Sequence, residues 1–434
     1  MSREVKIAIA GLGTVGAGTC RILREHGELL TERCGCSLVV SAVSARDRSR
    51  ERGIDLRNVP WFDDPVQMAA EADADVVVEL IGGAEGIAKA ICETALGRGR
   101  HVVTANKAML AHHGLSLARQ AEEKGLTLAY EAAVAGGVPI IKALREGLAG
   151  NKLRRIYGIL NGTSNFILTE MRRSGREFKA VLKDAQRLGY AEADPSFDVD
   201  GIDAAHKLAI LASVAFGCEM DFAGVYTEGI RHVSALDIVY AEELGYRIKL
   251  LGIVRMTEDG IEQRVHPCMV PLSVPIAYVE GVDNAIVAEG DFVGNTMFEG
   301  RGAGAGPTAS AIVADLVDIA RGRRLPTFSV PVGRLVKVSS APMERHKGAY
   351  YVRLMLLDRP GVIADVTAIL RDENVSLEAM LQRQRAPGSA VPIVLTTHET
   401  SEAAMRRALQ KIKRLDTIAE SPRMIRVEAF DDRS

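Results

Sequence analysis

The feature that most constrains the fold is a regular alternation of short apolar runs and helix-like stretches up to about residue 130. The runs, rich in Val, Ile and Leu, lie at 5–10, 38–45, 75–81, 101–104 and 126–131. The helix-like stretches between them lie near 14–33, 86–98 and 108–124. Strands that are apolar on both faces and separated by helices are typical of a parallel sheet buried between two helical layers. We therefore predict an α/β domain with a doubly wound parallel sheet.

A glycine-rich turn, GLGTVG at residues 11–16, directly follows the first predicted strand and begins the first predicted helix. Gly11 permits a tight turn, Gly13 lets the backbone approach a pyrophosphate, and Gly16 lets the helix pack closely on the strand. The helix N-terminus offers unpaired N–H groups and a partial positive charge to phosphate. GxGxxG alone is weak evidence, but strand, turn, helix and second strand in this order predict a Rossmann-type dinucleotide-binding domain over residues 1–134.

The residues after the second predicted strand bear on the choice between NAD and NADP. An acidic residue there binds the ribose 2′-hydroxyl of NAD, whereas a basic residue accommodates the 2′-phosphate of NADP. In this chain Arg46 and Arg48 flank Asp47, so the signal is mixed. We expect NADP, with NAD as the open alternative; a merely solvated charged loop is the third interpretation.

The pattern changes beyond residue 134. Helices are predicted at 165–173, 177–188 and 201–217, strands near 247–298, and a further helix near 308–322 after the glycine-rich stretch RGAGAGPTAS. Segregated helices and strands favour an α+β domain over 135–338, with its sheet covering the ligand cleft of the first domain. Residues 339–349 are polar and aperiodic, so we interpret them as a linker.

The C-terminal part, 350–430, has a compact βαββαβ pattern. Its strands are predicted at 350–357, 376–384, 390–397 and 423–429, and its helices at 361–373 and 401–414. This order and size predict a small ferredoxin-like module with a core of its own.

Composition excludes several classes of protein. The 54 Lys and Arg nearly balance the 56 Asp and Glu, which argues against a nucleic-acid-binding face and against a polybasic membrane-surface protein. No run approaches the ~18 apolar residues of a membrane span, and the first residues lack the features of a signal peptide. The six cysteines do not form a disulfide framework. We expect a soluble protein in the reducing cytoplasm.

The most informative stretch for chemistry is GYAEADPSFDVDGIDAAHKLAIL, residues 189–211. Asp203 and Lys207 are four residues apart, so they share one face of a helix. The apolar remainder of that helix desolvates Lys207, which lowers its pKa and suits it to proton transfer. The acidic loop before the helix suits a substrate ammonium, and it lacks the spacing of a calcium loop. The alternative is that Asp203 and Lys207 form an ordinary surface ion pair. We interpret His206 as an incidental neighbour of Lys207.

Lys107 lies just past the predicted strand at 101–104, on the carboxyl edge where ligands of such sheets bind. It is suited to contact cofactor or substrate, and the alternative is a polar residue that simply begins a helix.

Six motifs together resemble homoserine dehydrogenase over residues 1 to about 330. They are GLGTVG, TANKA at 104–108, EAAVAGGVP at 131–139, LNGTSNFI at 160–167, the 189–207 stretch, and GRGAGAGPTASA at 300–311. The tail, with DRPGV at 358–362, resembles an ACT domain, a small ligand-sensing fold often attached to enzymes of amino-acid biosynthesis.

The resemblance implies NAD(P)H-dependent reduction of L-aspartate 4-semialdehyde to L-homoserine, a step toward threonine, isoleucine and methionine. It implies that Lys207 is the proton donor and that Lys107 contacts both cofactor and substrate. The implied substrate-binding residues are Glu192, Asp203, Asp198, Gly162 and Thr163. The implied cofactor-binding residues are Gly11, Gly13, Thr14, Val15, Gly16, Arg46, Thr104, Lys107, Gly189 and Gly304. A monovalent cation such as Na⁺ is implied at Glu131, Val134, Gly136 and Val138, held mostly by backbone carbonyls.

Two classes of function compete. A regulator that binds nucleotide and amino acid without turnover needs only the glycine-rich turn and the tail. An enzyme also needs Lys107, Glu192, Asp203 and Lys207, and all four are present. A phosphorylating semialdehyde dehydrogenase would need a cysteine nucleophile with a base, and no cysteine lies in such a context. We expect the enzyme, as a homodimer or homotetramer, with threonine as the effector of the tail; the alternative is a tail that only strengthens oligomerisation.

Overall fold

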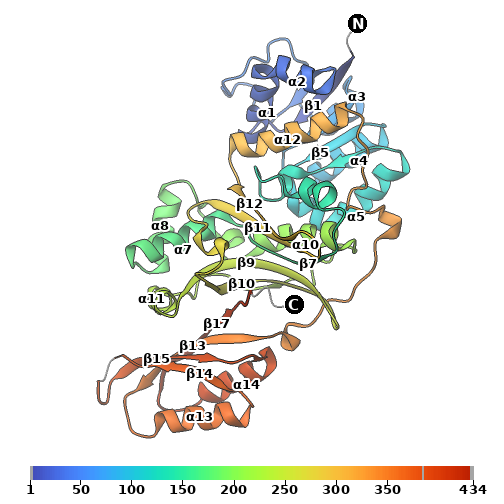
Figure 1. The fold of residues 1–434 in the computed structure, drawn as a ribbon. Helices are drawn as coiled ribbons and strands as arrows, with labels where there is room; N and C mark the ends of the chain where they lie inside the picture. The colour runs from blue at the N-terminus through green and yellow to red at the C-terminus, as the bar shows by residue number, and fades with distance from the viewer. Residues whose placement is uncertain (1–2, 384–385, 431–434) are drawn as a thin grey trace.

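The computed structural model describes residues 3–383 and 386–430. Three parts follow one another along the molecule: the N-terminal sheet domain, a large mixed sheet with its helices, and the C-terminal module (Figure 1). The predicted fold class is confirmed in each part.

The N-terminal sheet is parallel and has six strands. They are β1 (Glu4–Ala10), β2 (Ser37–Ser44), β3 (Trp61–Phe62), β4 (Val76–Glu79), β5 (His101–Thr104) and β6 (Leu128–Ala129), in the order β3-β2-β1-β4-β5-β6. The order reverses between β1 and β4, and ligands of such sheets bind outside the carboxyl ends of the strands at this reversal. The two-residue β3 was not predicted, because it has no apolar run of its own.

Helices cover both faces of this sheet. One face carries α3 (Pro65–Glu71), α4 (Ile87–Gly97) and α5 (Lys107–Glu123), which pack on Ala8 and Val77. The other face carries α1 (Thr14–Glu25), α2 (Gly27–Cys34) and α12 (Ala305–Ala320), which pack on Ile7 and Val78. Neighbouring residues of a strand face opposite sides, so one apolar run serves both cores. The helix α12, which follows the strands of the middle domain in the chain, therefore packs on the N-terminal sheet. The second-domain boundary at 135–338 stays a prediction.

The middle sheet is antiparallel and runs β12-β11-β7-β9-β10. Its strands are β7 (Leu153–Ile159), β9 (Tyr246–Thr257), β10 (Gly260–Pro271), β11 (Asp283–Gly290) and β12 (Gly294–Arg301). Its helices include α7 (Gly162–Ser174), α8 (Phe178–Arg187), α10 (Ile202–Phe216) and α11 (Ala235–Glu243). α10 contacts both this sheet and α5 of the N-terminal domain, so almost its whole circumference is buried. This explains why its sequence is apolar on every side.

The C-terminal module is βαββαβ as predicted. It contains β13 (Lys347–Leu357), α13 (Val362–Asp372), β14 (Leu377–Leu381), β15 (Ala390–Thr397), α14 (Glu402–Ile412) and β17 (Ile418–Val427). Its two helices share one apolar core with the sheet β17-β13-β15-β14.

The module is not separate from the middle domain. β17 pairs with β13 and, in parallel, with β10 through Cys268 and Met269 (Figure 1). One sheet of eleven strands therefore runs through both parts. Two of these strands are short: β8 (Tyr226–Thr227) pairs with β10, and β16 (Thr400–Ser401) pairs with β13. The predicted linker is also corrected: Ile261 exchanges backbone hydrogen bonds with Ser339 and Ala341, at 2.9 and 2.8 Å. β13 already begins at Lys347.

Within the described ranges, no helix combines the length and apolar character that crossing a bilayer requires. All six cysteines are free thiols.

Candidate active site

A cavity of about 630 Å³, which we call the main cavity, lies where α1, the start of α5 and the start of α12 meet the middle domain. It receives residues from distant parts of the chain, including the loops before α7, α10 and α12. The predicted site residues that line it are Val15, Lys107, Gly136, Gly162, Thr163, Gly189, Asp198, Asp203, Lys207 and Gly304.

Two lysines meet one buried carboxylate in this cavity. The Lys207 Nζ donates to Asp203 Oδ2 at 2.7 Å and to the carbonyl oxygen of Leu160 at 2.6 Å. The Lys107 Nζ lies 2.9 Å from the other carboxylate oxygen of Asp203. The side chains of Lys207 and Asp203 are 10% and 5% exposed, so the interpretation as a surface ion pair is wrong.

The surroundings shift the pKa values of this triad, Lys207, Asp203 and Lys107. Burial lowers the pKa of Lys207 below the ordinary 10.5, and the nearby Lys107 ammonium adds to this, while Asp203 opposes it. Burial would raise the pKa of Asp203, but the two lysines hold it below its usual range. Burial also depresses the pKa of Lys107, yet Asp203 outweighs this and the net shift is upward. Asp203 therefore stays ionised, and Lys207 is the group closest to releasing a proton.

Asn161 joins this triad to the acidic loop. Its Nδ2 donates to both Asp198 Oδ1 and Asp203 Oδ2 at 2.8 Å, while its Oδ1 caps α7 by accepting from the Ser164 N–H at 2.8 Å. Burial and the charge of Asp203 raise the pKa of Asp198. One asparagine thus fixes the spacing of two carboxylates and the start of a helix.

The other predicted substrate residues are placed differently. Thr163, on the cavity wall, donates its hydroxyl to the Tyr190 carbonyl at 2.8 Å. Glu192 is exposed and is not among the residues that line the cavity. His206 stacks on Phe222 with ring centroids 4.2 Å apart, and burial lowers its pKa to about 4. His206 is therefore a packed, neutral neighbour of Lys207.

The glycine-rich turn has the geometry that a dinucleotide site needs. Gly11 has φ of 101°, and a Cβ there would lie 2.6 Å from the Leu80 carbonyl oxygen. A Cβ on Gly16 would lie 2.0 Å from the Gly11 carbonyl oxygen, so strand and helix meet closely only because both residues are glycine.

The N-terminus of α1 is open to an anion. A Cβ on Gly13 would meet nothing within 4 Å, no side chain caps the helix, and its first turn, beginning at Thr14, holds no acid. At the neighbouring strand end, Thr104 is buried and donates its hydroxyl to Glu79 at 2.6 Å. The residues of the turn fit a bound pyrophosphate, with the helix dipole supplying partial positive charge.

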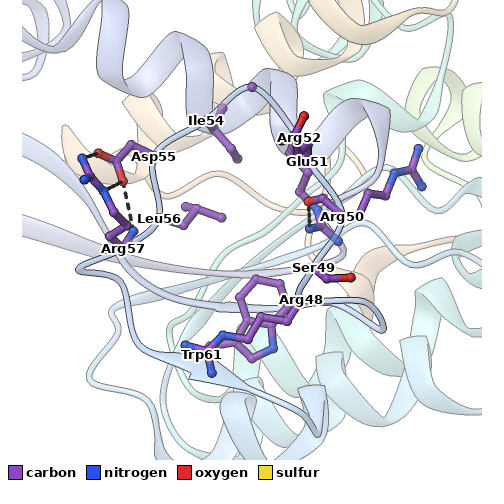
Figure 2. A pocket seen from close by; sticks show the side chains of 11 residues that line it. Arg48, Ser49, Arg50, Glu51, Arg52, Ile54, Asp55, Leu56, Arg57 and Trp61 are labelled. Atoms are coloured by element: carbon purple, nitrogen blue, oxygen red, sulfur yellow. Dashed lines mark hydrogen bonds and ion pairs between the residues drawn. The ribbon is translucent and has the colours of Figure 1, made fainter.

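A second pocket, of about 820 Å³, lies beyond the end of β2 and is lined by several arginines and Trp61 (Figure 2). The guanidinium carbons of Arg48 and Arg52 each lie 5.6 Å from the centre of the Trp61 ring. Arg57 turns to Asp55, with nitrogen–oxygen distances of 3.0 and 2.6 Å. The predicted Arg46 is exposed but does not line this pocket. A basic pocket with an aromatic wall fits the phosphate-bearing adenosine end of NADP.

The residues of the implied cation site lie together in the loop after β6. Each oxygen of the Glu131 carboxylate accepts a backbone N–H, from Ile141 and from Lys142, at 2.9 Å. Burial and the neighbouring Asp315 raise the pKa of Glu131 to about 7. Val134 and Val138 are buried, and Gly136 lines the main cavity. The Glu131 N–H donates to Asp315 Oδ2 at 2.9 Å, and the Lys142 Nζ lies 3.4 Å from Asp315 Oδ1. Two buried carboxylates with one lysine partner fit a bound monovalent cation in chemical terms.

Residue-by-residue reasoning missed two asparagines of the cavity. Asn161 belongs to the motif LNGTSNFI, and Asn284 is the second residue of β11. An uncharged amide has no distinctive spacing in a sequence, so its role appears only once its partners are known.

The arrangement can place a polar substrate against a protonated lysine, beside an open helix N-terminus that suits a dinucleotide. Comparison with known proteins agrees with this chemistry. Family models match three successive stretches: "Homoserine dehydrogenase, NAD binding domain" over residues 11–131, "Homoserine dehydrogenase" over 139–317, and "ACT domain" over 350–417.

Full-length relatives agree with the family models. The homoserine dehydrogenases of Neisseria gonorrhoeae and Pseudomonas aeruginosa are 46% and 45% identical, with 99% of this chain and 100% of each relative covered. The crystal structure of a homoserine dehydrogenase from Thiobacillus denitrificans is 47% identical, covers 98% of each chain and superposes with a TM-score of 0.92.

Proposed function

Because this chain belongs to the homoserine dehydrogenase family, it is an NAD(P)-dependent oxidoreductase acting on a CH–OH group, and we propose that Lys207 is its proton donor and NADPH its preferred cofactor. The reaction interconverts L-aspartate 4-semialdehyde and L-homoserine. The observation that carries the proposal is the cluster of buried Lys207 and Asp203 with partly exposed Lys107 on the wall of the main cavity.

Lys207 supplies the proton that reduction requires. NADPH, when bound, supplies the hydride that adds to the aldehyde carbon, which leaves negative charge on the former carbonyl oxygen. Lys207 donates a proton from its ammonium to that oxygen and becomes a neutral amine. Its lowered pKa makes this donation easier than from an ordinary lysine, and water then returns a proton to Lys207.

The neighbouring charges hold the substrate and the proton donor. Asp203 orients Lys207 and Lys107, and its negative charge keeps both cationic before the substrate binds. Lys107 faces the cavity as a positive group suited to the developing oxyanion or to the substrate carboxylate. Asp198 and Glu192 are suited to the substrate ammonium, with Gly162 and Thr163 forming the adjoining wall. Because Glu192 is exposed, its contact requires the 189–194 loop to move toward the cavity.

The cofactor site extends from the main cavity to the arginine pocket. Gly11, Gly13, Thr14 and Gly16 would hold the pyrophosphate, and Val15, Thr104, Gly189 and Gly304 the end near the substrate. Arg46 and Arg48 would bind the 2′-phosphate, which favours NADPH over NADH. A homoserine dehydrogenase from a hyperthermophilic archaeon, 29% identical over 73% of this chain, has been solved in complex with NADPH.

Further assignments rest on the family resemblance together with local chemistry. Glu131, Val134, Gly136 and Val138 would hold Na⁺ or another monovalent cation, which would offset the paired charge of Glu131 and Asp315. The ACT domain would bind an amino-acid effector, threonine, in a homodimer or homotetramer. The cytoplasm, which supplies NADPH and reduced thiols, would be its compartment.

One assay tests the central proposal. NADPH and NADH oxidation are followed with aspartate semialdehyde, with and without threonine, and we expect a higher kcat/KM with NADPH. A protein that binds both ligands without turnover would contradict the assignment of an enzyme and support a regulator. Equal kcat/KM for both cofactors would contradict only the cofactor preference.

A further inference from the structure

We propose that Asn284 is a positioning residue for Lys207, acting through the backbone carbonyl of Leu160. This inference rests on the proposed role of Lys207 as proton donor.

One carbonyl oxygen receives both side chains. The Lys207 Nζ donates to Leu160 O at 2.6 Å, and the Asn284 Nδ2 donates to the same oxygen at 3.0 Å. Leu160 follows β7 directly and is 1% exposed, while Asn284 is fully buried at the start of β11. The carbonyl is therefore held from two sides, with the lysine on one and the amide on the other.

The amide can be oriented in only one way. A carbonyl oxygen accepts hydrogen bonds, so the NH₂ group of Asn284 must face Leu160 and its Oδ1 must face away. That Oδ1 is buried and has no hydrogen-bond partner among the described residues. A buried acceptor without a partner lowers stability, so stability alone would favour an apolar side chain of similar shape here.

The loop before α12 clamps the side chain. A Cβ on Gly302 would lie 2.2 Å from Asn284 Cγ, so the backbone of this loop packs directly on the amide. Gly302 and Asn284 both line the main cavity. The amide therefore has little room to rotate away from Leu160.

This clamp determines where Lys207 can send its proton. An ammonium has three N–H bonds, and Asp203 and Leu160 accept two of them. With both acceptors fixed, the third N–H has one remaining direction. If Leu160 were free to turn, the ammonium could rotate about its Cε–Nζ bond, and the bond that favours its charged form would weaken.

The test uses Asn284→Leu, which keeps the approximate volume and removes the donor. We expect kcat for semialdehyde reduction to fall about tenfold, with KM for NADPH within about threefold of wild type. The alkaline limb of the kcat–pH profile should move to lower pH, because Lys207 loses part of the bonding that favours its protonated form. A purely structural role would change the melting temperature, in either direction, without moving that limb.

A second variant keeps the test decisive if Asn284→Leu does not fold. In Asn284→Asp the protonated carboxyl can donate to Leu160, and the ionised carboxylate cannot. The ratio of its kcat to that of wild type should therefore rise as pH falls.

Asn165→Leu is the matched control. Asn165 is 1% exposed, and its amide also donates to backbone carbonyls, those of Val279 and Asp283 at 3.2 and 3.3 Å, but it does not contact Leu160. We expect this variant to leave the alkaline limb unchanged.

Two failures are distinguishable. If Lys207→Arg leaves the alkaline limb where it is in wild type, the limb does not belong to Lys207, and the proposed function and this inference both fail. If Lys207→Arg moves the limb but Asn284→Leu does not, and the Asn284→Asp ratio is independent of pH, the role of Asn284 alone is overturned.

Discussion

Lys207 is held between two opposing influences. Its buried position favours the neutral amine, whereas Asp203 and the Leu160 carbonyl favour the ammonium. The balance leaves a cation that gives up its proton more readily than a solvated lysine does. We therefore expect the chemistry at this site to depend on the charge of Lys207.

Replacing Lys207 by Ala should lower kcat by about 10²–10⁴, the usual cost of removing a positioned acid, while NADPH affinity stays near that of wild type. Steady-state kinetics and a fluorescence titration with NADPH measure the two effects. Lys249→Met is the control, because Lys249 is also a buried lysine of the middle domain, 3% exposed, but does not line the main cavity. Activity of Lys207→Ala within a few-fold of wild type would exclude it as the proton donor.

The arginines after β2 decide cofactor choice if they bind the 2′-phosphate. Changing Arg46 and Arg48 together to Ala should raise KM for NADPH roughly ten- to a hundredfold, since a charge-assisted contact contributes about 1.5–3 kcal/mol, and should change KM for NADH far less. Arg98→Ala is the control, because it removes the same charge beside His101, at the opposite ends of the strands. We expect it to change neither KM. Equal changes of KM for NADPH and NADH would mean that the loop is only a solvated surface. If Arg50→Ala raises KM for NADPH more than the double variant does, the 2′-phosphate is bound by the pocket that Arg50 lines and not by Arg46.

At the scale of elements, the start of α6 (Ile140–Lys142) depends on a buried carboxylate. Glu131 accepts the first N–H groups of this helix, and its pKa is raised from 4.5 to about 7. Between these values the folded chain holds more protons than the unfolded chain, so stability falls as pH rises, by at most ~1.4 kcal/mol per pH unit.

A cation bound beside Glu131 should cancel this loss. We expect NaCl to raise the melting temperature more at pH 8 than at pH 5, relative to choline chloride at the same ionic strength. Glu131→Gln should abolish the difference, because it removes the charge that the cation offsets. Equal stabilisation at both pH values would argue against a cation at this loop.

Across the full structure, the ACT domain and the middle domain share a sheet and buried charges. Arg264 of β10 binds Glu428 beyond β17, with Nη2 donating to Oε2 at 3.1 Å, and both residues are buried. Arg426 of β17 binds Glu228 of the middle domain at 2.9 Å. The middle domain and the C-terminal module are therefore packed together and are not two domains joined by a free linker.

Removing the chain after Ser339 should be costly for this reason. It would expose the edge of β10 and remove Glu428 from Arg264, which would keep Glu262 as a carboxylate partner at 2.8 Å. Breaking a buried ion pair typically costs about 3–5 kcal/mol, and we expect part of that cost here. We expect the truncated chain to melt at least several degrees lower than the full chain or to aggregate, as measured by calorimetry and light scattering. A truncated chain as stable as the full chain would show that the shared sheet contributes little.

Regulation is better tested by a smaller change. The Tyr226 hydroxyl donates to Glu228 at 2.9 Å and accepts from Arg406 and Arg426 at 2.9 and 3.2 Å, so it bonds to both parts. The segment beyond Glu228 reaches the acidic loop, because Ile230 N donates to the Val199 carbonyl at 2.9 Å. Tyr226→Phe should weaken threonine inhibition several-fold, within the 1–3 kcal/mol usual for coupling between sites, while kcat without threonine is retained. Unchanged inhibition would mean that coupling takes another route.

The sequence by itself determined the elements and part of the site. Apolar runs on both faces predicted the parallel strands, GLGTVG predicted the turn before α1, and the spacing of Asp203 and Lys207 predicted their contact. Each of these signals is local, because a strand, a turn or an i,i+4 pair is specified by residues close together in the chain.

Contacts between residues far apart in the chain are seen only in the tertiary structure. It placed α12 on the first domain, joined β17 to β10, brought Lys107 to Asp203, and set Asn161 and Asn284 near Lys207 through Asp203 and the Leu160 carbonyl. None of these contacts has a signal in local spacing. Which buried amide meets which carbonyl depends on how whole elements pack, and packing is specified by shape and burial summed over the molecule.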